Sequence, residues 1–180
     1  MIREYMIDKG KSPAKNDCIM FSVDSSTKKT GISIFVNGDL WKCLLVDCSS
    51  IKNMDERFPE MCRSIILLFM EYRPYIVYIE ETVVNRNVST QRFLTRIQGA
   101  VYAWCIFNDC EFNTVRPTEW RKTFNFNSAD GKRLTRDQLK EEAVKYIQSH
   151  FNISVNDDIA ESICIGLHAM ENFKRILAKD

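Results

Sequence analysis

Four carboxylates stand where they could hold divalent metal ions. Asp24 and Glu80 each end an apolar run, and Asp158 and Glu161 lie three residues apart where a helical apolar pattern begins. A ligand set made only of oxygen suits magnesium or manganese, whereas zinc is typically held by Cys and His. Two such ions about 4 Å apart activate a water and stabilise the leaving oxygen when a phosphodiester is cut. The residue types therefore indicate two-metal hydrolysis of a phosphodiester.

Two predicted strands position the first pair of acids. One apolar run leads to Asp24, and a second, residues 75–79, leads to Glu80. A helical pattern over residues 54–72 separates the two runs, so the second strand is expected to return parallel to the first. Both carboxylates then reach the same edge of the sheet. Glu81 competes with Glu80, although strand alternation sends their side chains to opposite faces.

The start of the last predicted helix positions the second pair. Asp158 and Glu161, at i and i+3, project from one helix face and could reach one ion, whereas Asp157 is turned about 100° away. The helix dipole also favours acids in a first turn, so a purely structural role for Asp157 or Asp158 stays open. It also stays open whether Asp157 takes part in binding the metal. Asp24, on the central strand, is expected to bridge the two ions.

The rest of the pattern predicts an α/β fold with one mixed sheet flanked by helices. Asn37 followed by Gly38 is a tight-turn signal between the second and third strands. The first three strands are expected to be antiparallel and the last two parallel. Residues 1–17 are interpreted as a flexible N-terminal arm and residues 18–180 as a single domain. The five predicted strands cover residues 18–23, 31–36, 40–46, 75–79 and 111–115.

The composition indicates a soluble chain of one domain. The sequence has 180 residues, of which 45% are hydrophobic and 27% charged, enough for one sizeable core. Seven Cys occur without a CxxC pair, so they are interpreted as small core residues in a reducing compartment rather than as disulfides or a zinc site. No apolar run approaches the roughly 18 residues of a membrane span, and no targeting segment opens the chain. We expect a cytoplasmic protein with no membrane partner and no organic cofactor.

A set of ordered segments carries the acids along the chain: VDSSTKKTGISIF, VYIEE, QRFLTRIQGAV, RPTEWRK and DDIAESICIGLHA. In this order they resemble the RuvC family of Holliday junction resolvases, particularly its phage-type members, over nearly all of residues 18–169. The resemblance implies an RNase H-like fold, a homodimer with two active sites, and paired nicks in branched, four-way DNA junctions. It also implies two magnesium ions per site, which manganese can replace. The catalytic and metal-binding acids that it implies are Asp24, Glu80, Asp158 and Glu161.

Basic residues are concentrated in two stretches. Residues 82–108 hold three Arg and no acid, and residues 116–145 hold eight Lys or Arg against five acids, although the formal net charge is only +1. Such cations attract a polyanion, whereas ordinary solvated charge is the alternative for any single Lys. The candidates for DNA binding are Arg86, Arg92, Arg96, Arg121, Lys122, Lys132 and Arg133.

Two further side chains have alternative interpretations. Lys140 is a catalytic candidate near the scissile phosphate, because the helix bearing it precedes the acidic turn. With Glu141 and Lys145 it also fits a solvated helix face. Trp120, beside Arg121, could stack on a base, whereas a Trp within TEWRKTF also fits a core anchor.

Other functions are compatible with parts of the pattern. An acid followed by small hydroxyl residues and Gly31 also resembles the phosphate-binding turn of a sugar kinase or actin-like ATPase, but that fold needs two such domains and 180 residues cannot supply them. A resolvase-like nuclease that trims structured ribosomal RNA precursors is weakly disfavoured by RPTEWRK. A non-catalytic domain that binds branched nucleic acid is disfavoured because all four acids are present.

Overall fold

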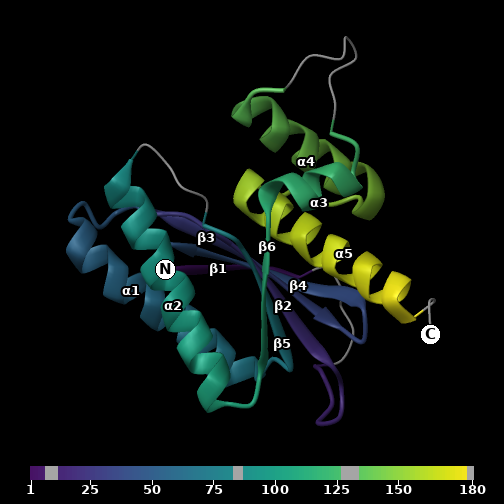
Figure 1. Cartoon of the computed structure of the whole chain (residues 1–180), viewed down its shortest axis with the longest axis horizontal. Helices are drawn as coiled ribbons and strands as arrows, with labels where there is room; N and C mark the ends of the chain where they lie inside the picture. The colour runs from purple at the N-terminus through teal and green to yellow at the C-terminus, as the bar shows by residue number, and fades with distance from the viewer. Residues whose placement is uncertain (7–11, 83–86, 127–133, 178–180) are drawn as a thin grey trace.

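A single six-stranded mixed sheet forms the centre of the computed structural model (Figure 1). The structure describes residues 1–6, 12–82, 87–126 and 134–177, with side chains for all of these except residues 5, 6 and 172–177. The strands are β1 (Ile2–Met6), β2 (Ile19–Ser25), β3 (Lys29–Val36), β4 (Asp39–Asp47), β5 (Ile76–Glu80) and β6 (Glu111–Val115). Their order across the sheet is β1-β4-β3-β2-β5-β6, so the predicted α/β class with a mixed sheet is confirmed.

The predicted number of strands was wrong by one. Residues 2–6, which the sequence assigned to a flexible arm, form β1 and pair antiparallel with β4. The amino group of Met1 also donates a hydrogen bond to the carbonyl oxygen of Asp47, at 3.0 Å. An edge strand of this kind is held largely by its neighbour's backbone groups, which leave little pattern in its own side chains. The assignment of residues 18–180 to one domain stays a prediction.

Asn37 and Gly38 make the tight turn that the sequence predicts between β3 and β4. Their φ angles are 52° and 93°, the left-handed values that a two-residue type I′ hairpin requires at both positions. Val36 and Asp39 pair across the turn. The Asn37 side chain also accepts a hydrogen bond from the backbone of Cys18, at 2.9 Å, which ties the turn to the start of β2.

Helices connect the strands that run parallel. α1 (Met54–Tyr72) lies between β4 and β5, and α2 (Val88–Phe107) lies between β5 and β6. As predicted, β5 runs parallel to β2, with Ile79 paired to Val23. Asp24 and Glu80 each follow this pair by one residue. The expectation that both acids reach the same edge of the sheet is therefore confirmed.

The remaining helices cover the opposite face of the sheet from α1 and α2 (Figure 1). They are α3 (Pro117–Thr123), α4 (Arg136–Phe151) and α5 (Asp157–Leu177). Side chains alternate along β2, so Phe21 and Val23 enter the core beneath α1 and α2, whereas Met20 enters the core beneath α5. By the same alternation, Asp24 and Glu80 face the layer that contains α5.

Side-chain caps mark where α4 and α5 begin. The backbone N–H of Gln138 donates to Thr135 Oγ1 at 3.3 Å, and the backbone N–H of Thr135 donates to Gln138 Oε1 at 2.9 Å. Before α5, Asn156 Oδ1 accepts from the backbone N–H of Ile159 at 3.1 Å. These caps place Lys140 in the first part of α4 and three acids in the first turns of α5.

Among the described residues, no helix has the length and apolar character needed to cross a membrane. All seven Cys are free thiols, and those at positions 43, 48, 105, 110 and 164 are buried. The interpretation of the Cys as core residues is confirmed for these five.

Candidate active site

The carboxyl-terminal ends of β2 and β5 present two acids side by side. Asp24 is buried, with 7% of its surface exposed, and Glu80 is the last residue of the neighbouring parallel strand. Both belong to strands that are otherwise apolar on the opposite face, so their backbones are held by core packing. The sheet therefore fixes the backbone positions from which these two side chains extend.

Gly31 allows the start of α5 to approach this edge. It pairs with Asp24 across β2 and β3. A Cβ atom at position 31 would lie 2.0 Å from the backbone oxygen of Asp158 and 2.9 Å from the backbone nitrogen of Ile159. Because only a glycine leaves room for the helix backbone, Gly31 brings the acidic first turn of α5 next to Asp24.

The buried acids raise one another's pKa. Burial raises the pKa of Asp24 well above its usual range, and the charges of Glu80, Glu161 and Asp158 raise it further. Within the described residues, no hydrogen bond or ion pair reaches the Asp24 carboxylate. Burial also raises the pKa of Asp158, with the charge of Asp157 adding to the effect. This edge of the sheet thus holds negative charge that the protein compensates only in part.

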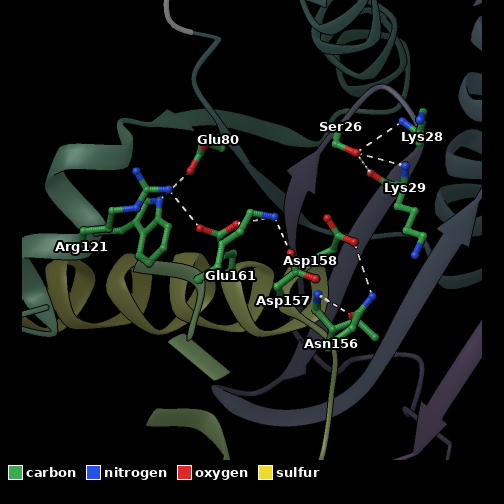
Figure 2. A network of polar contacts seen from close by, with 12 residues as sticks. Ser26, Lys28, Lys29, Glu80, Arg121, Asn156, Asp157, Asp158 and Glu161 are labelled. Carbon is green, nitrogen blue, oxygen red and sulfur yellow. Dashed lines mark hydrogen bonds and ion pairs between the residues drawn. The ribbon is translucent and has the colours of Figure 1, made fainter. Parts of the chain in front are cut away.

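Two cations neutralise the acids of α5. Arg121, on α3, donates to Glu161 Oε1 at 3.0 Å, and Figure 2 shows it reaching toward that carboxylate. Lys140, on α4, lies 3.8 Å from Glu161 Oε2 and forms a closer ion pair with Asp157. Burial lowers the pKa of Lys140, but the hydrogen bond to Asp157 and the charge of Glu161 outweigh it and raise that pKa overall. Lys140 therefore faces the acids and does not belong to a purely solvated helix face.

Asp157 and Asp158 have different surroundings although they are adjacent. Burial acts to raise the pKa of Asp157, but the hydrogen bond and charge of Lys140 prevail and lower it. Asp158 receives a longer contact, 3.4 Å, from the side-chain amide of Asn156 (Figure 2). The structure thus assigns Asp157 an ion-pair partner and leaves Asp158 turned to the buried edge.

Trp120 is a core residue that also contacts the site. Its side chain is completely buried, and its indole N–H donates to Glu80 Oε2 at 2.8 Å. Burial raises the pKa of Glu80, while this hydrogen bond and the charge of Arg121 lower it in part. The interpretation of Trp120 as a platform for a stacked base was wrong, because no face of the ring is accessible. The core anchor is the correct alternative.

Glu81 does not share the position of Glu80. Its carboxylate accepts from Arg116 Nε at 3.0 Å, and both side chains are exposed by more than a third. Alternation at the strand end therefore separates a buried acid from a surface ion pair, as the sequence predicts.

The arrangement of the carboxylates bears on whether they could hold a metal ion. Across the part of the chain that the structure describes, no three His, Cys, Asp or Glu side chains form a group that could hold a metal ion as they stand. As the acids stand, Trp120 donates to Glu80, and Arg121 and Lys140 form ion pairs with Glu161. The donor chemistry nevertheless fits magnesium or manganese, since every donor is a carboxylate oxygen and no cation of the described residues contacts Asp24. The role of the four acids as ligands stays a prediction.

The turn after Asp24 does not form a phosphate-binding loop. The hydroxyl oxygen of Ser26 accepts from the backbone N–H groups of Lys28, at 3.4 Å, and Lys29, at 3.0 Å (Figure 2). A phosphate would need such N–H groups to be free. The turn therefore serves to connect β2 and β3, which argues against the kinase or ATPase alternative.

The predicted DNA-binding residues fall into three groups. Arg92 and Arg96 are exposed on α2, and the Arg96 guanidinium lies 6.0 Å from the ring of Phe58. Lys122 is exposed on α3, next to Arg121. The others, Arg86, Lys132 and Arg133, lie outside the described residues.

Arg136 is a residue that the sequence analysis missed. It is exposed at the start of α4, and its charge lowers the pKa of Glu80 in part, so it lies near the site. The available signal was its place directly after the capping residue Thr135, one turn before Lys140.

Comparisons with known proteins support the predicted resemblance. No protein-family model matches the chain. The crossover junction endodeoxyribonuclease RuvC of Chlorobaculum parvum is 26% identical over 92 residues, which are 49% of this chain and 49% of that protein. The chain thus matches about half the length of this curated relative.

Solved structures share the fold over most of the chain. A structure of T. thermophilus RuvC in complex with a Holliday junction substrate matches with a TM-score of 0.62 and 14% identity, over 84% of this chain and 91% of that chain. The yeast mitochondrial Holliday junction resolvase Ydc2 matches with a TM-score of 0.51 and 14% identity, over 93% and 88%. The predicted resemblance to RuvC and the RNase H-like fold are therefore confirmed.

Proposed function

We propose that this protein is a metal-dependent endonuclease that resolves four-way DNA junctions by paired nicks. The observation that carries the proposal is the group of four acids at one sheet edge, on the fold of a protein solved with a Holliday junction substrate. A buried carboxylate without a contacting cation lowers the stability of the fold. Such a group is expected where function requires a bound cation.

Asp24, Glu80, Asp158 and Glu161 are the proposed ligands of two magnesium ions, which manganese could replace. Bound there, the ions would supply an activated water and stabilise the leaving oxygen. Arg121 and Lys140 now neutralise Glu161 and lie beside the acids. Because guanidinium and ammonium groups bind phosphate as well as carboxylate, these two cations are proposed to hold the phosphate that is cut.

The exposed cations are proposed to bind the rest of the DNA. Arg136 lies near Glu80 at the start of α4, and Lys122 is exposed on α3 next to Arg121. Arg92 and Arg96 lie on α2, which follows the strand that carries Glu80. Contacts to phosphate supply affinity that falls as salt rises. Replacing Arg92 and Arg96 together is expected to lower the salt dependence of junction binding.

A homodimer is the proposed assembly, because paired nicks need two active sites. The stripe of α2 formed by Gly99, Tyr102 and Ile106 is the proposed contact surface. Tyr102 and Ile106 are 51% and 58% exposed, and nothing lies within 4 Å of a Cβ built at Gly99. Gel filtration of the protein at the concentration used for cleavage tests this point, since elution at the mass of one 21.0 kDa chain would contradict it.

The seven free thiols support a reducing compartment such as the cytoplasm.

The decisive experiment compares three labelled substrates in magnesium: a four-way junction, a linear duplex with the same arms and a structured RNA. Symmetric nicks in the junction are expected, with the duplex and the RNA left intact. Asp24→Asn should abolish the nicks and retain junction binding, while Asp39→Asn, at an exposed acid in the β3–β4 turn, should change neither.

Two results would contradict the proposal. Cleavage of the RNA alone would indicate the ribosomal-RNA type of nuclease. Tight junction binding without cleavage, in magnesium and in manganese, would indicate a binding domain.

A further inference from the structure

Trp120 connects the hydrophobic core to one proposed metal ligand. The indole is completely buried beneath α5, near the ring of Phe126, whose centroid is 6.2 Å away. Arg121 covers the ring, with its guanidinium carbon 4.7 Å from the centroid. From this fixed position the indole N–H donates to Glu80 Oε2 at 2.8 Å. The ring is held from several sides, so the direction of its single donor is fixed.

An indole differs from the other partners of the acids in its charge. Arg121 and Lys140 are cations, which must give up some of their contact with Glu161 if that carboxylate is to bind a metal ion. The Trp120 N–H is neutral and can donate only one hydrogen bond. It therefore orients Glu80 Oε2 without cancelling the charge of the carboxylate, and it leaves the second oxygen available.

We propose that Trp120 is a positioning residue, which holds the Glu80 carboxylate in the orientation that binds metal. This inference rests on the proposed function, because it assumes that Glu80 is a ligand. It gives α3 a second role in the site, beside the contact of Arg121 with Glu161. Hydrogen-bond partners of metal ligands typically change metal affinity by about 10- to 100-fold when they are replaced.

The chain offers a matched control in Trp41. This residue, on β4, is also a buried tryptophan, with 7% of its surface exposed, and it packs against Tyr72 beneath α1. Its indole nitrogen is buried and has no hydrogen-bond partner among the residues that the structure describes. Trp41→Phe thus removes an indole N–H with no hydrogen bond to the described residues, whereas Trp120→Phe removes one that donates to Glu80.

The first experiment measures manganese binding by calorimetry in the absence of DNA. Trp120→Phe is expected to weaken Mn²⁺ binding about 10-fold or more, and Trp41→Phe to leave it unchanged. In a Glu80→Gln background, Trp120→Phe should add little further loss, because the partner of the indole has been changed. With junction substrate, Trp120→Phe should cut slowly at limiting Mn²⁺ and regain most of the wild-type kcat at saturating Mn²⁺, a rescue that a loss of folded protein would not show.

The second experiment does not need Trp120→Phe to fold. Protein labelled with ¹⁵N at its three tryptophans gives indole N–H resonances that Trp41→Phe and Trp104→Phe assign by elimination. The Trp120 resonance is expected to shift on addition of Mg²⁺ and in Glu80→Gln, while the other two stay in place.

The outcomes separate this inference from the function on which it rests. If the wild-type chain binds Mn²⁺ and cuts junctions, but Trp120→Phe binds Mn²⁺ equally tightly, the inference alone is overturned. A Trp120 resonance that ignores Glu80→Gln would overturn it as well. A wild-type chain that binds no Mn²⁺ would overturn both the metal site and the role of Trp120.

Discussion

The two faces of the sheet are packed in different ways. Toward α1 and α2, the strands present large apolar side chains, and Phe21 meets Phe69 edge to face with ring centroids 5.2 Å apart. Toward α5, β2 presents small and polar residues after Met20: Ser22 donates to the carbonyl oxygen of Ser162 at 2.7 Å, and Asp24 follows two residues later. A Cβ at Gly166 of α5 would lie 2.2 Å from the ring of Phe35. Large side chains separate one face of the sheet from its helices, whereas Gly31 and Gly166 let α5 approach the other face closely at two points.

This difference explains why the acids lie where they do. A helix that packs on bulky side chains stays about 10 Å from a sheet, so short carboxylates on the two elements cannot converge. Ser22, Gly31 and Gly166 remove that bulk beneath α5. The same strands therefore supply stability through one set of alternate residues and a site through the other.

The largest expected effect comes from changing the acid at the end of β5. Glu80→Gln should lower the rate of junction cleavage about 1,000-fold, equal to about 4 kcal/mol, because it removes a charge that a metal ion would bind. Binding of the junction should be nearly unchanged. Glu81→Gln is the matched control, since it alters an exposed ion pair with Arg116. Equal losses in both variants would mean that the two faces do not divide function as described.

Gly31→Ala tests whether backbone spacing builds the site. The new Cβ would collide with the backbone of Asp158, which should lower the free energy of unfolding by about 3 kcal/mol and slow cleavage by displacing α5. Urea denaturation and single-turnover cleavage measure the two effects. Gly99→Ala, whose new Cβ meets no other atom of its own chain, should instead stabilise the protein by about 1 kcal/mol at dilutions where the proposed dimer contact at Gly99 is absent. Wild-type stability in Gly31→Ala would contradict the close approach of α5.

Ile79→Ala tests the opposite face of β5, the strand that ends in Glu80. Ile79 is completely buried beneath α1 and α2, so its truncation should lower the free energy of unfolding by about 2 kcal/mol. Cleavage by the folded protein should keep the wild-type rate, because the side chain points away from Glu80. A large fall in the rate constant at full saturation, measured well below the melting temperature, would break the division between the faces.

The smallest effect concerns the pH dependence of stability without metal. The pKa of Asp24 is raised in the folded chain above its ordinary value of 3.8, so the folded state binds the proton more tightly than the unfolded state. The free energy of unfolding contributed by this group therefore falls as pH rises from about 4 through the raised pKa, by at most about 1.4 kcal/mol per pH unit. Asp24→Asn removes this dependence.

Urea denaturation in EDTA over a pH series measures this effect. The advantage in stability of Asp24→Asn over the wild type should grow with pH. A constant difference between the two proteins would show that Asp24 is not held in a site that disfavours its charge.

Local patterns made most of the fold predictable. The apolar runs, the Asn37–Gly38 turn and the Thr135–Gln138 cap each depend on residues close together in sequence, and the structure confirms them. β1 was missed because it is an edge strand whose partner, β4, lies about 40 residues away. Pairing of that kind depends on the backbone of the neighbour more than on the strand's own residues.

The sequence by itself determined which acids could form a site, because strand alternation and helical spacing are properties of the chain: Asp24, Glu80, Asp158 and Glu161 follow from them. Only the tertiary structure decided which groups contact those acids. Trp120 reaches Glu80 and Arg121 reaches Glu161 across 40 residues of sequence each. No local pattern encodes such contacts, since they depend on how α3 docks against α5 and the end of β5, and that docking arises from packing of the whole core.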